Sequence, residues 1–160
     1  MKHIIAFCLS IAILGAGCST DATSLSGPSA VQKKPASGTM LDLSGRGLTS
    51  IPMDVFSRSE LTGLDLSDNL LTGAPQSQIG QLKNLKTLDL SNNSLTGLPA
   101  ELGQLDKLET LDVSNNQLTG LPMELGNLTQ LRVLDITGNK YSARDLDEIA
   151  KKLTATEIRR

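Results

Sequence analysis

The chain of 160 residues has the length of one domain, and its 15 basic and 17 acidic side chains give a mildly acidic formal net charge of −2. No basic patch interleaved with aromatic side chains is present, which argues against nucleic acid as a partner. The one histidine, His3, and both cysteines, Cys8 and Cys18, lie near the N-terminus, so the rest of the chain has no histidine or cysteine for nucleophilic catalysis, a zinc site or a disulfide.

The first 17 residues have the pattern of a secretory signal peptide. Lys2 supplies a positive charge, an apolar run extends from Ile4 to Leu14, and the small residues 15–17 follow. The apolar run is too short to favour a transmembrane helix. We therefore predict a signal peptide over residues 1–17 that is removed before Cys18.

Cys18 stands directly after the predicted cleavage point. Residues 14–18, with the sequence LGAGC, resemble the lipobox of bacterial lipoproteins, although the leucine lies one position further from the cysteine than is usual in that motif. The resemblance implies a diacylglyceryl group on the Cys18 sulfur and an acylated new N-terminus, and two or more acyl chains anchor a protein stably to a membrane. The alternative is plain secretion with an incidental cysteine.

Residues 18–37 contain mainly Ser, Thr, Ala, Gly and Pro, with few side chains that could be buried. This composition predicts a lipidated, flexible tether between the membrane and the rest of the chain. Ser19 after the cysteine resembles the outer-membrane sorting default of envelopes with two membranes. The expected location is therefore the bacterial cell envelope, lipid-anchored to a membrane, and to the outer membrane where there are two.

From residue 38 onward the chain repeats itself with a period of about 23 residues. Residues 85–107 read LKTLDLSNNSLTGLPAELGQLDK and return, slightly altered, as residues 108–130. The spacing L-x-x-L-x-L-x-x-N-x-L-x-x-L-P-x-x-L-x-x-L resembles the leucine-rich repeat family of the 23-residue type. Such a period is typical of a solenoid, in which stacked units share one core. Within a repeat domain of residues 38–160, we place the repeats at 38–60, 61–84, 85–107, 108–130 and 131–153.

The resemblance implies an α/β solenoid, a right-handed superhelix with a parallel sheet on its concave side. The alternation in Leu88-Asp89-Leu90 predicts a strand with both leucines inside and the aspartate outside. The resemblance also implies that one asparagine per repeat ends the strand and bonds the backbone of the turn, in a ladder formed by Asn69, Asn93, Asn116 and Asn139. Arg46 takes this position in the first repeat, which we interpret as an N-terminal cap.

The fifth repeat departs from the pattern after Tyr141. Ser142–Asp145 has the form of a capping box, and apolar side chains follow at helical spacing, at Leu146, Ile149, Ala150 and Leu153. This pattern predicts an amphipathic helix over the open end of the core, with Lys151 and Lys152 in its last turn. Residues 156–159, with Ile158 inward, are predicted to add a short edge strand.

Five aspartates share one strand position, and a hydroxyl follows each of them two residues later. In a parallel stack the hydroxyls are expected to form a column on the concave face beside a column of the aspartates, which is made of Asp42, Asp65, Asp89, Asp112 and Asp135. One interpretation is a cation site or a groove for a basic ligand. The other is that Leu-Asp-Leu-Ser is the ordinary family pattern with a solvated face. Further concave positions differ in charge between repeats and offer polar specificity, at Lys86, Glu109 and Arg132.

No glycine-rich nucleotide loop is present, and neither a cofactor nor a catalytic or metal site is expected. The sequence predicts a non-enzymatic, membrane-anchored monomer whose small solenoid binds a protein or an envelope ligand. Phe56 and Tyr141 are the only aromatic residues beyond the signal segment, so weak or avid binding is expected in place of tight monovalent recognition. The alternative is a structural or adhesive surface lipoprotein without a specific partner.

Overall fold

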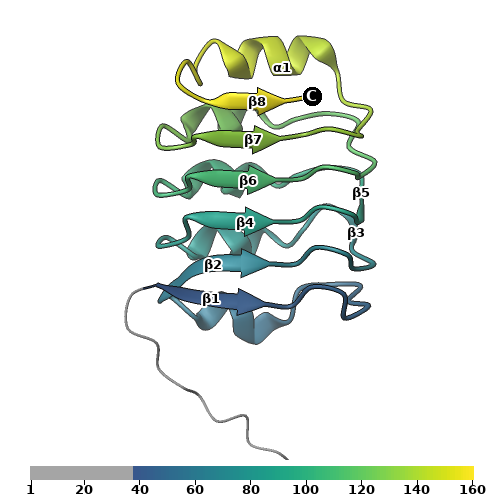
Figure 1. Ribbon diagram of the computed structural model, residues 1–160, viewed down its shortest axis with the longest axis vertical. Coiled ribbons are helices and arrows are strands. Elements are labelled where there is room, and N and C mark those ends of the chain that lie inside the picture. Colours follow the sequence, from purple (N-terminus) through teal and green to yellow (C-terminus); the bar gives the residue numbers. More distant parts are fainter. Residues whose placement is uncertain (1–37) are drawn as a thin grey trace, which may run out of the picture. The chain divides into compact units, whose positions relative to one another are not determined.

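The computed structural model describes residues 38–160. Six short strands form one parallel sheet in the order β1-β2-β4-β6-β7-β8, as Figure 1 shows. Their bounds are β1 Thr39–Asp42, β2 Leu61–Asp65, β4 Thr87–Asp89, β6 Thr110–Asp112, β7 Val133–Asp135 and β8 Glu157–Arg159. The predicted repeat solenoid with a parallel sheet is confirmed. The predicted signal peptide, Cys18 and the tether of residues 18–37 lie outside the described residues.

Successive strands pair in register, so equivalent residues of neighbouring repeats lie side by side. One row points into the core, and its members are Leu41, Leu64, Leu88, Leu111, Leu134 and Ile158. The four central members are fully buried, whereas Leu41 and Ile158, at the two ends of the row, are partly buried. The alternation read from the sequence therefore holds through the whole sheet.

Four short 3₁₀ helices form the layer opposite the sheet, η1 Met53–Ser57, η2 Ser77–Gln81, η3 Ala100–Gln104 and η4 Met123–Asn127. A proline directly precedes three of them, at Pro52, Pro99 and Pro122, where its fixed φ suits the entry and no N–H is needed. The sequence analysis did not predict these helices, because five residues are too few to show a helical period.

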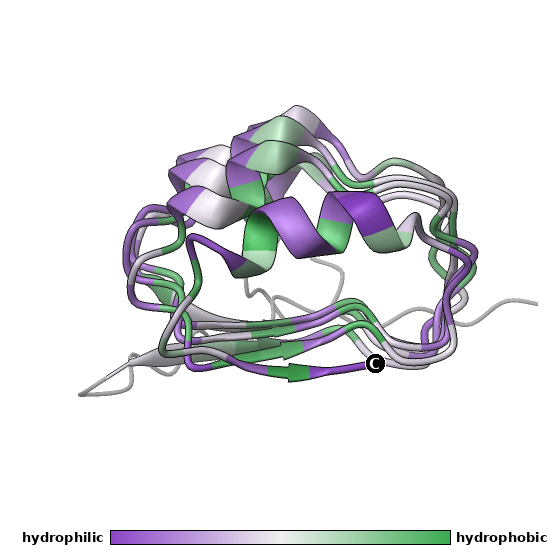
Figure 2. Ribbon diagram, turned by 90° about the horizontal axis from the view of Figure 1, so that it is seen from above, coloured by the Kyte–Doolittle hydropathy of each residue, from purple (hydrophilic) through white to green (hydrophobic). Residues whose placement is uncertain are grey.

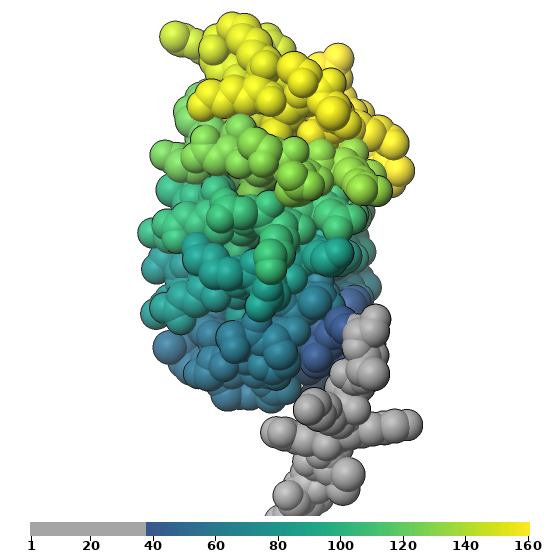
Figure 3. Space-filling view, turned by 90° about the vertical axis from the view of Figure 1, so that its left-hand side faces the viewer, coloured from purple at the N-terminus to yellow at the C-terminus, as the bar shows by residue number. Residues whose placement is uncertain are grey.

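A core of aliphatic side chains lies between the sheet and the helical layer, and Figure 2 shows these two layers facing each other. Leu61, Leu85 and Leu108, for example, are 0% exposed. Each repeat adds one layer along the stack, and Figure 3 shows these layers following one another in chain order. None of the helices in residues 38–160 has the length and apolar character needed to span a membrane.

The asparagine ladder has the geometry that the family resemblance implies. Asn93 Nδ2 donates to the carbonyl oxygens of Leu90 and Ser91 in its own repeat and of Leu66 in the preceding repeat, at 3.0–3.1 Å. Its Oδ1 accepts the Leu71 N–H of the preceding repeat at 3.0 Å. The residue before each ladder position has a positive φ and is an Asp, Asn or Gly, the types that best tolerate it. The ladder is thus confirmed.

The second repeat contains one extra residue, and the structure shows how it is accommodated. Ala74 is exposed, while Pro75 is buried where the other repeats have Ile51, Leu98 or Leu121. The following Gln76 joins two repeats, because its side-chain amide donates to the Ile51 carbonyl at 2.9 Å and accepts the Ile51 N–H at 3.4 Å. The insertion therefore adds a contact between the first and second repeats.

The C-terminal end is covered as predicted, with two corrections. Helix α1, Ala143–Ala150, buries Leu146 and Ile149, and β8 pairs with β7. The capping box is wrong, because the Ser142 side chain makes no capping hydrogen bond although Ser142 occupies the N-cap position. The placement of Lys151 and Lys152 in the last turn is also wrong, because the helix ends at Ala150. Leu153 lies beyond the helix and is buried in the core.

Candidate binding surface

The outward surface of the six-stranded sheet, called the sheet face below, carries the candidate residues. Parallel pairing in register places equivalent outward side chains in rows that run from strand to strand. One of these rows, called the carboxylate column below, consists of Asp42, Asp65, Asp89, Asp112 and Asp135. The structure therefore brings all five predicted aspartates into one line.

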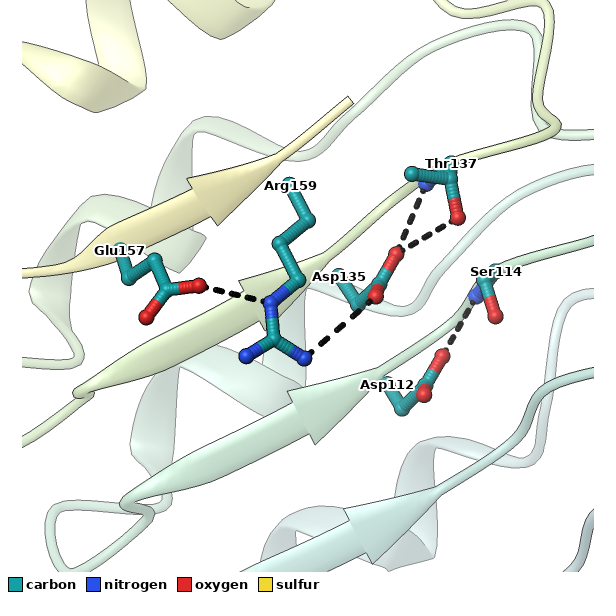
Figure 4. Close-up of polar contacts among 6 residues, drawn as sticks. All are labelled: Asp112, Ser114, Asp135, Thr137, Glu157 and Arg159. Carbon is teal, nitrogen blue, oxygen red and sulfur yellow. Dashed lines mark hydrogen bonds and ion pairs between the residues drawn. The ribbon is translucent and has the colours of Figure 1, made fainter.

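Each member of the carboxylate column holds the turn that follows its own strand. Asp89 Oδ1 accepts hydrogen bonds from the Ser91 backbone N–H at 2.9 Å and from the Ser91 hydroxyl at 2.7 Å. A backbone N–H two residues on is bound in the same way at Asp42 and Asp65. The same bond at Asp112 and Asp135 is shown in Figure 4. One oxygen of each carboxylate is thus committed to the fold, and Oδ2 is the atom left to face a partner, except at Asp135, where Oδ2 lies near Arg159.

The hydroxyl groups do not form a second exposed row. The serines two residues after the central aspartates are buried, namely Ser67, Ser91 and Ser114. The sequence analysis placed these hydroxyls beside the carboxylates on the concave surface. The turn at the end of each strand instead buries these hydroxyls, and those of Ser67 and Ser91 donate to the carboxylate of their own repeat, so they are not available to a ligand.

The same Asp–Ser motif has opposite electrostatic consequences in an inner repeat and at the end of the stack. At Asp89, burial raises the pKa, and the neighbouring charges of Asp112 and Asp65 act in the same direction. At the exposed Asp42, hydrogen bonds from the Ser44 hydroxyl and backbone lower the pKa. Burial in the stack therefore makes the charge of Asp89 unfavourable, while that of Asp42 is stabilised.

Arg159 continues the carboxylate column on β8, in register with Asp135. Its Nε donates to Glu157 Oε1 at 2.7 Å, and its Nη1 lies 4.0 Å from Asp135 Oδ2 (Figure 4). These acidic neighbours, Glu157 above all, raise the pKa of Arg159. The sequence analysis predicted the final strand over residues 156–159 but did not assign Arg159 to this column, although the strand register places it there.

A second group of charged side chains lies at the start of the strands and is called the charged cluster below. Its central member, Glu109, lies between Lys86 and Arg132, with Lys86 Nζ 3.0 Å from Oε1 and Arg132 Nε 3.9 Å from Oε2. The hydrogen bond and charge of Lys86 lower the pKa of Glu109. The cluster borders a shallow depression of about 340 Å³ that Asp106, Lys107 and Gln130 complete. All three predicted variable residues thus come together.

The chemistry of this surface is recognition by charge and hydrogen bonding. Among residues 38–160, no three His, Cys, Asp or Glu side chains come together in a way that could hold a metal ion. The carboxylates are spread along the column, with one oxygen each engaged by a turn. The arrangement can offer a row of negative charge and a cluster of mixed charge to a partner.

Comparison with known proteins identifies the repeat architecture. The family model described as "Leucine rich repeat" matches residues 39–95, 59–118 and 83–140. The structure of a leucine-rich repeat protein of Leptospira interrogans is similar over 69% of the chain, with 44% identity and a TM-score of 0.65, and the match covers 28% of that protein. Among curated proteins, none matches the chain.

Two further structures have the same architecture. A chain of the BIR3–SERK2 complex of Arabidopsis thaliana is 39% identical over 64% of this chain and 57% of its own length, with a TM-score of 0.59. An internalin of Listeria monocytogenes is 26% identical over 68% of this chain and 31% of its own length, with a TM-score of 0.60. The chain thus spans less than two thirds of the length of each of these proteins.

Proposed function

The chain belongs to the leucine-rich repeat family, and from this premise we propose that it is a non-enzymatic binding module of the bacterial cell envelope whose sheet face recognises a protein or other envelope ligand. Members of the family bind proteins or ligands, and one similar structure is itself a protein–protein complex. The observation that carries the proposal is the charged cluster. Lys86, Glu109 and Arg132 differ in charge on a frame of strands that is otherwise repeated.

The charge of the sheet face indicates the chemistry of the partner. Seven carboxylates lie on it, those of the carboxylate column together with Glu109 and Glu157, against the cationic side chains of Lys86, Arg132 and Arg159. A partner that presents cationic groups complements this excess of negative charge, which favours encounter and fixes orientation. Phe56 is buried, so the surface has few aromatic anchors, and binding is weak for one copy alone.

Anchoring to a membrane is the second part of the proposal. The sequence LGAGC at residues 14–18 supports lipidation of Cys18, and the composition of residues 18–37 supports a tether. Copies held at one membrane surface engage a multivalent partner with a high effective concentration, so that weak individual contacts suffice. Attachment to a membrane, and to the outer membrane where the envelope has two membranes, is therefore consistent with weak binding by each single copy.

A capture experiment with charge-reversed variants tests the proposal. Residues 38–160 are immobilised, and proteins bound from an envelope extract of the source organism are compared for the wild type, Glu109→Lys and Glu124→Lys. Glu124 is an exposed carboxylate on η4, so it carries the same change on the helical side. We expect a saturable partner that Glu109→Lys loses and Glu124→Lys retains. A partner retained by both variants would contradict the proposal and favour the structural or adhesive alternative.

A further inference from the structure

From the second strand of the sheet onward, the backbone carbonyl at the column position accepts a hydrogen bond from the equivalent N–H of the preceding repeat. The Asp65 carbonyl accepts the Leu43 N–H of the preceding repeat at 2.8 Å, and the Asp89 carbonyl accepts the Leu66 N–H at 2.9 Å. The same bond recurs in the later repeats, at the carbonyls of Asp112, Asp135 and Arg159. At this position each strand of the sheet is therefore joined to the one before it.

The Asp42 carbonyl occupies this position in β1, the first strand of the sheet in the described part of the chain. Arg46 Nη2 donates to that carbonyl at 3.0 Å, where a backbone N–H of a preceding repeat would otherwise bind. Arg46 replaces the ladder asparagine, and each ladder amide needs a carbonyl of the preceding repeat, as Asn69 needs that of Leu43. An asparagine at position 46 would lack this acceptor, whereas the longer arginine reaches back to the strand edge.

Apolar side chains lie beside this edge, together with the exposed Asp42 and Arg46. Leu41 and Leu48 are only partly buried against the core, and Met40, whose side chain lies over Gly63 of β2, is 56% exposed. Within residues 38–160, the only α-helix covers the other end of the stack (Figure 1). An exposed edge strand with apolar side chains is a template for pairing with another chain, and proteins protect such edges with charged side chains.

We propose that the N-terminal edge of the sheet is a pairing surface for a second copy of this chain, and that Arg46 keeps it closed. Residues of a parallel ladder alternate in direction, so Leu43 faces β2 while Asp42 and Met40 direct their backbone groups to the free edge. Two copies of β1 pair antiparallel about Leu41, with Met40 of each opposite Asp42 of the other. The guanidinium of Arg46 occupies the Asp42 acceptor that this pairing requires.

The two ends of the stack favour this head-to-head contact over head-to-tail stacking. The outer side of α1 carries exposed charged residues, Asp147, Glu148 and Lys151. Head-to-tail stacking would bring β1 of one copy to β8 of the next, and the charged α1, which lies beyond β8 at that end, would face the first repeat (Figure 1). Head-to-head pairing instead brings the partly buried Leu41 of both copies together and closes at a dimer, because the same surface is used on both copies. This contact is separate from the binding function proposed for the sheet face.

The test measures, by analytical ultracentrifugation, how the molecular mass depends on protein concentration. It compares the wild-type repeats, Arg46→Ala and Arg58→Ala, each in the full chain carrying Cys18→Ser. We expect the wild-type repeats to stay monomeric and Arg46→Ala to rise to a plateau at roughly twice the monomer mass, because a two-fold contact closes on itself. Arg58→Ala is the matched control, since it removes the same charge from the same repeat but from a pair with Asp54 on η1. It should remain monomeric.

A second variant distinguishes pairing through the β1 edge from nonspecific association. Adding Met40→Pro to Arg46→Ala removes an N–H that points to the free edge, a position where proline is tolerated in strands, and should restore the monomer. Circular dichroism verifies that each variant is folded. A monomeric Arg46→Ala, a wild type that is already dimeric, growth beyond the dimer, or a dimer that survives Met40→Pro would each overturn the proposal.

Discussion

At the residue scale, the buried side chain of Asn93 forms hydrogen bonds with backbone groups of two repeats. Its amide nitrogen donates to carbonyl groups of both repeats, and its oxygen accepts one backbone N–H. Asn93→Ala leaves these buried groups without partners, and we expect a loss of roughly 1–3 kcal/mol in the free energy of unfolding. Asn84→Ala is the control, because its bond to the Ser59 carbonyl is exposed. Denaturant unfolding should show little change for it, and equal effects would contradict the ladder.

The charge of Asp89 is predicted to destabilise the fold near neutral pH. Its folded-state pKa is raised by burial, so the stabilising contribution is present when the group is protonated and is lost as the pH rises through that pKa. Asp89→Asn keeps an oxygen that accepts both Ser91 donors but carries no charge. We expect the variant to be at least as stable as the wild type at pH 7, with an advantage that shrinks as the pH falls toward 4.

Asp42→Asn provides the comparison of opposite sign. The pKa of Asp42 is lowered by hydrogen bonds from Ser44, so its ionised form contributes stability above the unfolded-state pKa, and that contribution is lost in acid. The asparagine variant should therefore be less stable than the wild type at neutral pH, with a difference that disappears as the pH falls. Urea titrations at several pH values measure both. Identical pH profiles for the two variants would show that stacking does not separate their environments.

The positions of the candidate residues follow from the sequence, but their bonds do not. A shared strand position is enough to place Asp89 and Asp112 in one column, because register is fixed by the leucines of the same repeat. The inward turn of Ser91 depends on backbone angles after the strand, including the positive φ of Asn92, which spacing alone does not show. The role of Arg46 needed the three-dimensional path of its side chain.

At the element scale, close stacking of the 3₁₀ helices depends on glycine. A Cβ added at Gly103 in η3 would overlap the backbone carbonyl of Glu124 in η4. We expect Gly103→Ala to cost about 1–3 kcal/mol, because backbone atoms of the next repeat would have to move. At the equivalent Gly126 the added Cβ would meet Lys152 Cδ at 2.6 Å, which is part of a flexible side chain and not of the backbone. Gly126→Ala should therefore cost less in thermal unfolding, and the reverse order would contradict this packing.

Long elements and short elements differ in how well the sequence predicts them. The C-terminal helix could be recognised because Leu146, Ile149 and Leu153 recur at helical spacing; its start at Ser142 was predicted correctly, whereas its capping bond and its C-terminal end were not. The 3₁₀ helices show no such period, and the two-residue strands β3 Thr72–Gly73 and β5 Ser94–Leu95 are shorter still. For these elements the local path is set by stacking on the neighbouring repeat, which a single repeat does not encode.

At the scale of the whole molecule, the repeat period alone determines the architecture, since each unit can bury its leucines only against the next. The sequence departs from the period at the two ends of the stack, at Arg46 and after Tyr141. Arg46 binds a carbonyl of the first strand, and the residues after Tyr141 form the helix that covers the last repeat. The sequence also indicates a class of function through the family. It places Lys86, Glu109 and Arg132 in one row, because they share a position of the repeat, but it does not show the ion pairs between them, which depend on side-chain rotamers.

Membrane anchoring through Cys18 is a prediction for the whole chain. Cys18→Ala should move the protein from the detergent-soluble membrane fraction to the soluble fraction, because the two or more acyl chains needed for stable attachment are lost. Cys8→Ala is the control, since Cys8 lies within the predicted signal peptide. Fractionation of both variants, with labelling by radioactive fatty acid, measures the effect. Unchanged fractionation of Cys18→Ala, or an unlabelled wild type, would exclude the anchor.

Carboxyl footprinting of the complex between residues 38–160 and a captured partner tests the sheet face most directly. Carbodiimide labels exposed carboxylates, and mass spectrometry reports the label at each position. Glu109 on the sheet face has a side chain 34% exposed, and Glu124 on η4 is exposed as well, so both are labelled in the free protein. We predict that the partner reduces labelling of Glu109 and leaves Glu124 unchanged. Protection of Glu124 with no change at Glu109 would contradict recognition by the sheet face.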